Sequence, residues 1–221
     1  MDRKSIAQEY FALATDENGN MPPMHRDESK AGIMAACMMD LFLNDVITME
    51  EKRITVNKEL PTELAHESSL HDYLSEKVRT ADKLMSDYLL SSSARRIKQL
   101  ATAIGEALLA DGVVREGTGG LFGPKVTYVT AESYRKELVD RVRSAATKND
   151  DVSSHDMALL YILKETKNLN RYFSKEESDQ LKDRLKEMKK NPQNKQVAVM
   201  INCVTDITSI AMACILMIGL H

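Results

Sequence analysis

The stretch Val197–Leu220 reads VAVMINCVTDITSIAMACILMIGL, with no basic residue and a single acid, Asp206. A run of this length could cross a bilayer, which needs roughly 20 mostly apolar residues. It also fits a helix that is buried on nearly all sides inside a helical domain. The fold of the chain depends on which of the two it is.

The polar residues of this stretch favour the buried helix. Asn202, Thr205, Asp206, Thr208 and Ser209 form a band near its middle, where a membrane penalises a charge by about 3 kcal/mol. Neither end carries Trp or Tyr, the residues that are enriched at membrane interfaces. We therefore expect the central helix of a core, with the other helices packed around it.

The composition is that of a globular domain. The chain has 221 residues, of which 43% are hydrophobic and 29% charged, and its net charge is −3. This net charge argues against a protein that simply coats nucleic acid, while leaving room for a local basic patch. Three cysteines without paired spacing (Cys37, Cys203 and Cys214) indicate free thiols in a reducing cytoplasm. The N-terminus has no apolar core typical of a signal peptide.

Hydrophobic periodicity predicts a mainly α fold: one compact helical domain over residues 1–221, around the apolar C-terminal helix, with two short β-hairpins. Ser5 and Gln8 have the spacing of a capping box at the start of a short first helix. The other predicted helices cover residues 30–43, 70–90 (as one or two helices), 94–110, 131–145, 154–167 and 175–190. The hairpins fall at residues 46–56 and 113–129.

Two acids lie inside apolar helical segments, Asp40 in the first core helix and Asp206 in the terminal one. A buried carboxylate needs a hydrogen-bond or ion-pair partner. We expect both to be such partners, for example as caps of a neighbouring helix.

No pattern in the sequence predicts an enzyme, a metal site or a cofactor. The five histidines are scattered, and His66 and His71 lack the i, i+4 spacing of two ligands on one helical face. The glycine-rich loop Gly117–Pro124 lacks the Gly-Lys-Ser/Thr ending of a phosphate-binding loop and leads into a strand. It is better explained as the tip of a hairpin.

Basic residues gather in the first turn of the helix predicted after Ser93. Arg95, Arg96 and Lys98 oppose the dipole there, and a bound anion would reverse that penalty. The alternative is that the helix starts elsewhere and that these cations are ordinary solvated side chains. A second candidate surface is Leu121-Phe122 at the hairpin tip, which would be exposed unless a partner chain or a membrane covers it.

Several stretches follow one another in a distinctive order and spacing: SIAQEYFALATDENGN (5–20), KAGIMAACMMDLFLNDVI (30–47) before a hairpin, and RRIKQLATAIGEALLADGVV (95–114) before the Leu121-Phe122 hairpin. In this order and spacing, the chain resembles the Golgi phosphoprotein 3 family over most of its length. The helix DMALLYILKETKNL and the apolar terminal helix follow in the same order.

The resemblance implies a non-enzymatic, peripheral membrane protein that binds phosphatidylinositol 4-phosphate and helps to retain glycosyltransferases in the Golgi. The lipid site of the family uses a tryptophan and three arginines, which align with His25, Met34, Lys98 and Ala101 here. Lys98 keeps a cation, and Arg95 and Arg96 are possible substitutes one turn earlier. The family hairpin, in which Leu121-Phe122 match in character, mediates self-association and can contact membranes.

We therefore expect a cytoplasmic protein that binds an anionic lipid headgroup near His25, Arg95, Arg96 and Lys98. It would associate peripherally with the cytoplasmic face of a membrane and self-associate through the Gly117–Pro124 hairpin. Two alternatives remain. The helix at residues 94–110 followed by a two-stranded wing is the local order of a winged-helix nucleic-acid-binding module, and the helical surface could instead be a protein-interaction scaffold without a ligand.

Overall fold

The computed structural model of the protein describes residues 3–90, 94–119, 125–147, 152–190, 202 and 205–213. These residues are mainly helical, with two small antiparallel sheets, which confirms the predicted fold class. The elements follow in this order: α1 Ile6–Ala14, η1 Pro23–His25, α2 Arg26–Leu43, β1 Ile47–Glu50, β2 Arg53–Val56, η2 Thr62–Glu67, α3 Ser68–Ser75, β3 Arg79–Thr80, α4 Ala81–Leu89, α5 Arg95–Ala110, β4 Val114–Gly119, β5 Lys125–Thr130, α6 Glu132–Thr147, α7 Ser154–Glu165, η3 Asn168–Arg171 and α8 Lys175–Lys190.

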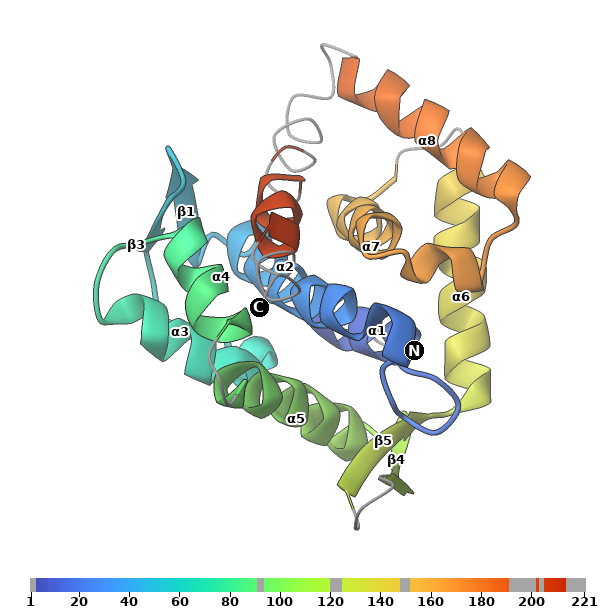
Figure 1. Cartoon of the computed structure of the whole chain (residues 1–221), viewed down its shortest axis with the longest axis horizontal. Helices are drawn as coiled ribbons and strands as arrows, with labels where there is room; N and C mark the ends of the chain where they lie inside the picture. Colours follow the sequence, from blue (N-terminus) through green and yellow to red (C-terminus); the bar gives the residue numbers. More distant parts are fainter. Residues whose placement is uncertain are drawn as a thin grey trace.

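Helices α1 and α2 lie at the centre of the fold (Figure 1). Every residue of α1 is buried, and so is every residue of α2 from Ala31 to Leu41. A Cβ at Gly32 would lie 2.0 Å from the Tyr10 hydroxyl, so glycine lets the two helices approach closely at this point. The other helices pack around this pair.

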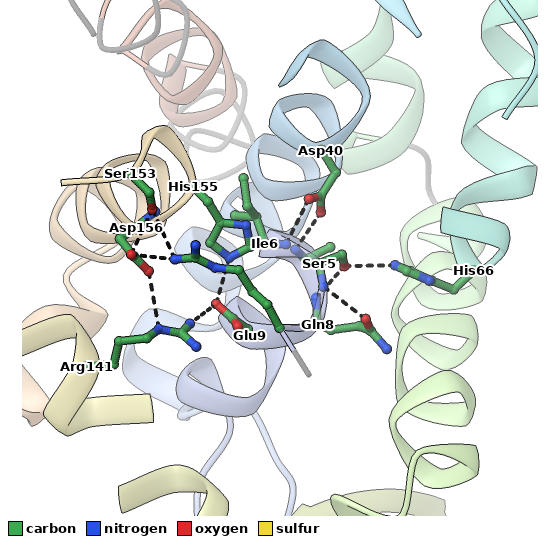
Figure 2. Close-up of polar contacts among 12 residues, drawn as sticks. Ser5, Ile6, Gln8, Glu9, Asp40, His66, Arg141, Ser153, His155 and Asp156 are labelled. Atoms are coloured by element: carbon green, nitrogen blue, oxygen red, sulfur yellow. Dashed lines mark hydrogen bonds and ion pairs between the residues drawn. The ribbon is translucent and has the colours of Figure 1, made fainter. Parts of the chain in front are cut away.

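The N-terminus of α1 is capped by its own residues and by α2. The Ser5 side chain accepts the backbone N–H of Gln8, and the Gln8 side chain accepts that of Ser5, which confirms the predicted capping box. The two carboxylate oxygens of Asp40 accept the backbone N–H groups of Ile6 and Ala7, each at 2.8 Å. Figure 2 shows this cap. The prediction that Asp40 caps a neighbouring helix is therefore confirmed.

A buried acid in α1 joins this helix to α6 and α7. Glu9 is 1% exposed, and its carboxylate pairs with Arg141 and, at 2.8 Å, with His155 Nε2 (Figure 2). Asp156 pairs in turn with Arg141 Nε at 3.2 Å and with Arg3. The charge of Glu9 is thus compensated inside the fold, as a buried carboxylate requires.

The C-terminus of α1 is capped by arginines from later elements. Arg171 of η3 donates to the carbonyls of Leu13 at 3.1 Å and Thr15 at 3.2 Å, and Arg135 of α6 donates to the carbonyl of Thr15. The Tyr172 hydroxyl donates to Leu13 O at 2.7 Å. Cations at this end suit the helix dipole. They also hold the chain as it leaves α1.

The sheets confirm both predicted hairpins. β1 pairs antiparallel with β2, and β4 with β5. Glu51 and Lys52 in the first turn have positive φ angles of 46° and 65°, as the tightest hairpin turns require. The short strand β3, which pairs with β2, divides the helical segment predicted over residues 70–90 and was missed by the sequence prediction.

The described part of the C-terminal stretch is a helix over residues 205–213. Ile207 and Ala211 are fully buried in the core, but Asp206 and Ser209 are exposed. The predictions of burial on nearly all sides and of a buried partner for Asp206 are therefore wrong for these residues, because α1 and α2 fill the centre and leave one face of this helix in solvent. Apart from Asn202, the rest of Val197–Leu220 lies outside the described residues. No helix in the described ranges is long and apolar enough to cross a membrane.

Candidate anion-binding pocket

An open pocket of about 700 Å³ lies where α1, the loop after it, the start of α2, α5 and β5 meet. In Figure 1, α5 runs below α1 and α2 toward β5. The residues that line the pocket are Phe11, Thr15, Gly19, Asn20, Met21, Arg26, Lys30, Ile97, Lys98, Ala101, Thr102, Val126, Thr127 and Tyr128.

Three of these residues are cations, namely Arg26, Lys30 and Lys98, and none is an acid. The Lys30 ammonium donates to Asp27 at 2.6 Å at the margin of the pocket. Across the described parts of the chain, the Arg26 side chain makes no hydrogen bond or ion pair. A concave surface lined by charges of one sign concentrates the field of those charges. The pocket is therefore suited to an anion.

The start of α2 brings Arg26 and Lys30 to the pocket. The sequence pattern predicts a helix that begins at residue 30, but α2 begins at Arg26. Ser29 is fully buried inside the helix, where its hydroxyl accepts Asn168 Nδ2 at 3.1 Å. Asp27 in the first turn suits the helix dipole. With this earlier start, the two cations stand at i and i+4 on one helical face.

Helix α5 contributes Lys98 because its amphipathic pattern turns one face to the core. Ile97, Leu100 and Ile104 are buried, while Lys98 is exposed. Lys98 and Thr102 also line a second, more open depression of about 450 Å³ along α5, together with Arg95. Glu106 lines the same depression, so the cations of α5 share that surface with an acid.

The wall on the side of the hairpin is built by β5. The ring of Tyr128 packs on α5 at Gly105, where a Cβ would lie 2.1 Å from the ring, and meets Phe11 edge to face at 6.4 Å between centroids. Burial raises the pKa of Tyr128. Thr127 is 3% exposed, and its hydroxyl has no hydrogen-bond partner within the described structure. Buried polar groups seldom remain unpaired, so this hydroxyl is an exception within the wall of the pocket.

The structure brings only part of the predicted site together. Arg95 and Lys98 line the depression along α5. The Arg96 guanidinium instead lies over the ring of Tyr73, 5.1 Å from its centroid, and His25 lies beside Glu28, with 3.7 Å between Nδ1 and Oε1. Neither Arg96 nor His25 lines the pocket. Leu121 and Phe122 lie outside the described residues, so the predictions made for them remain predictions.

Sequence reasoning missed Arg26 and Lys30. The predicted helix starts at residue 30, which leaves Arg26 outside it. The spacing of the two cations was the available signal, since a helix that starts earlier places them four residues apart on one face.

Of the four positions identified from the family resemblance, only some line the pocket. Lys98 and Ala101 line the pocket, whereas Met34 is fully buried in the core. The cations of α2 occur one and two turns before Met34, at Lys30 and Arg26. The basic character of the pocket is therefore supplied by other residues of the same helix.

The fold and the pocket define a mainly α-helical protein with an open, basic pocket beside a β-hairpin. The chain belongs to the Golgi phosphoprotein 3 family, because the family model described as Golgi phosphoprotein 3 (GPP34) matches residues 6–204. A search of curated proteins found no match. Within the residues that the structure describes, no group of three or more His, Cys, Asp or Glu side chains could hold a metal ion.

Proposed function

We propose that the chain is a non-enzymatic protein that binds a phosphate-bearing lipid headgroup in the pocket between α2, α5 and β5. It would associate peripherally with the cytoplasmic face of a membrane. The observation that carries the proposal is the convergence of Arg26, Lys30 and Lys98 on one open pocket without an acid in its lining.

The chemistry of these side chains suits a phosphate monoester. The guanidinium of Arg26 can donate two parallel hydrogen bonds to phosphate oxygens, and the ammonium groups of Lys30 on the same helix and of Lys98 on α5 add positive charge. A volume of about 700 Å³ lies within the usual range for small-ligand pockets.

Apolar side chains near the pocket support a membrane-bound ligand. Val126 lines the pocket and is 57% exposed, and Met24, two residues before Arg26, is 84% exposed. Exposed apolar groups beside cations match an anionic bilayer surface, with its charged headgroups over an apolar interior. Membership in the Golgi phosphoprotein 3 family makes phosphatidylinositol 4-phosphate the first lipid to test. Self-association and membrane contact through Leu121-Phe122 form part of the same proposal.

Vesicle flotation tests the proposal. The full chain is mixed with phosphatidylcholine vesicles that contain phosphatidylinositol 4-phosphate, or phosphatidylserine at matched charge, or neither. Lys98→Glu reverses one pocket charge. Lys77→Glu makes the same change at an exposed position after α3 and is the matched control. Inositol 1,4-bisphosphate is added as a soluble competitor, to separate recognition of the headgroup from attraction to surface charge.

We expect the wild type and Lys77→Glu to float with anionic vesicles, and Lys98→Glu to lose most of this binding. Competition by the soluble headgroup would show that the pocket recognises phosphate groups. Equal flotation of Lys98→Glu and the wild type would place the membrane-binding surface elsewhere. If the wild type does not float with any of the three kinds of vesicle and does not bind the soluble headgroup, the proposal is wrong.

A further inference from the structure

One wall of the pocket is the loop that joins α1 to η1, residues 15–21, which we term the wall loop. Thr15, Gly19, Asn20 and Met21 of this loop line the pocket. Asp16 belongs to the loop but does not line the pocket. An acid so close to a basic pocket lowers the attraction for an anion by simple Coulomb repulsion. Any favourable contribution of Asp16 to binding must therefore come from its hydrogen bonds.

Asp16 organises the wall loop around itself. Its Oδ1 accepts the backbone N–H groups of Asn18 and Asn20, each at 2.9 Å. Its own N–H donates to Asn20 O at 2.8 Å, and its carbonyl accepts Gly19 N–H at 3.1 Å. These bonds close the loop into one hydrogen-bonded unit, since a short carboxylate side chain can accept from the backbone two residues further on.

Two contacts then fix this unit against the rest of the fold. Arg135 of α6 donates through Nη2 to Asp16 O at 3.1 Å and through Nη1 to Thr15 O. The second contact is with β5: Gly19 has a φ of 74°, and a Cβ there would lie 2.6 Å from the carbonyl oxygen of Tyr128. The wall loop is therefore held between α6 and β5, with Asn20 and Met21 directed to the pocket by these contacts.

We infer that Asp16 is a positioning residue for the anion pocket and that Arg135 assists it. The side-chain oxygen of Asp16 holds Asn18 and Asn20 in place, and this geometry outweighs the unfavourable charge. The inference rests on the proposed function of the pocket. If Asp16 acted through its charge alone, its removal would strengthen anion binding. If it positions the loop, removal of its side chain weakens anion binding.

Two substitutions at Asp16 separate geometry from charge. Asp16→Asn removes the charge but keeps the Oδ1 acceptor, whereas Asp16→Ala removes both. Glu17→Ala removes the same charge at the next position, where the side chain is exposed, and serves as the control. The probe is soluble inositol 1,4-bisphosphate, measured by calorimetry, with Lys98→Glu in parallel. Hydrogen exchange at the Asn18 and Asn20 amides reports on the loop itself, and unfolding midpoints show that each variant is folded.

We expect Asp16→Asn and Glu17→Ala to bind the probe as tightly as the wild type or more tightly. Asp16→Ala should bind at least about fivefold more weakly, with faster exchange at Asn18 and Asn20 and no change at amides of α5. Arg135→Met should weaken binding in the same direction while the Asp16 side chain remains in place.

Three outcomes would overturn the inference. Binding by Asp16→Ala that equals or exceeds that of the wild type would show that Asp16 contributes only charge. Binding by Asp16→Asn as weak as that by Asp16→Ala would show that the charge itself is needed. If the wild type does not bind, or if Lys98→Glu binds as the wild type does, the proposed function of the pocket fails first and the inference fails with it.

Discussion

The carboxylate of Asp40 in α2 accepts the backbone N–H of Ile6, the first residue of α1, at 2.8 Å. A side chain of one central helix thus caps the other, in a place that water does not reach, since Asp40 is 3% exposed. Burial raises the pKa of Asp40 to about 6, and the bonds from Ala7 and Ile6 oppose this rise. The cap is both a link between the two helices and a titratable group in the core.

Removal of this cap should destabilise the fold. Asp40→Ala leaves the N–H groups of Ile6 and Ala7 buried without acceptors, and each such loss costs roughly 1–3 kcal/mol. We expect a decrease of about 3 kcal/mol in the free energy of unfolding, measured in urea. Asp40→Asn, which keeps one acceptor, should lose less. Asp206→Ala removes an exposed acid and should change stability by less than about 0.5 kcal/mol. Equal losses for Asp40→Ala and Asp206→Ala would contradict the role of the cap.

Glu67 should make stability depend on pH. It is fully buried, and burial, together with the neighbouring Asp40, raises the pKa of its carboxyl well above the usual 4.5. The folded state therefore keeps a proton that the unfolded state releases above pH 4.5. Stability provided by this group is present at low pH and decreases as pH rises, by at most about 1.4 kcal/mol per pH unit.

Glu67→Gln removes this titration while keeping the shape of the neutral acid. We expect the stability of the variant relative to the wild type to increase between pH 5 and pH 7.5, as measured by urea unfolding at each pH. Glu63→Gln changes an exposed residue of the same 3-10 helix and should give a difference that does not vary with pH. A constant difference for Glu67→Gln as well would mean that the buried carboxyl is ionised.

The contact between Gly105 and Tyr128 should set the position of the pocket wall. Gly105→Ala places a Cβ 2.1 Å from the Tyr128 ring, so β5 must move away from α5. Overpacking of this kind typically costs about 1–3 kcal/mol. We expect that loss in urea unfolding, together with weaker binding of inositol 1,4-bisphosphate. Glu106→Ala, at the exposed position next in sequence, should leave stability within about 0.5 kcal/mol. Wild-type stability in Gly105→Ala would show that the packing is looser than described.

The cations of α2 should matter more for binding than Arg96 of α5. Arg26→Ala removes a charged donor from the pocket, a contact of about 1.5–3 kcal/mol, and should weaken vesicle binding by about tenfold or more. It should also reduce the dependence of binding on salt. Arg96→Ala should have little effect, because this guanidinium lies over Tyr73 outside the pocket. If Arg96→Ala weakened vesicle binding more than Arg26→Ala, the result would favour the site predicted from the sequence.

Local signals predicted most of the fold. The capping box of Ser5 and Gln8 and both hairpins could be predicted because their partners are close in sequence. The role of Asp40 could be predicted from the general need of a buried carboxylate for donors. The exposure of Asp206 could not, since the apolar composition of its segment does not show which helix occupies the centre.

Less of the candidate site could be predicted from the sequence. Its wall loop and hairpin come together only in three dimensions, as the contact of Gly19 with Tyr128 shows. The family resemblance identified Lys98 but not Arg26 or Lys30, because in this chain the cations of α2 occupy earlier turns. A precise start of α2 was needed, and helix boundaries are the least certain part of such predictions.

The contacts of α1 have a consequence for the order of folding. Glu9 pairs with Arg141 and His155, and the carbonyl of Leu13 accepts from Arg171 and Tyr172, so this helix bonds residues more than 130 positions away. Such high contact order slows folding, because long loops must close before the contacts form. On the ribosome, α1 thus emerges well before α6, α7 and η3, and its contacts with Arg141, His155 and Arg171 form only after those elements have been synthesised.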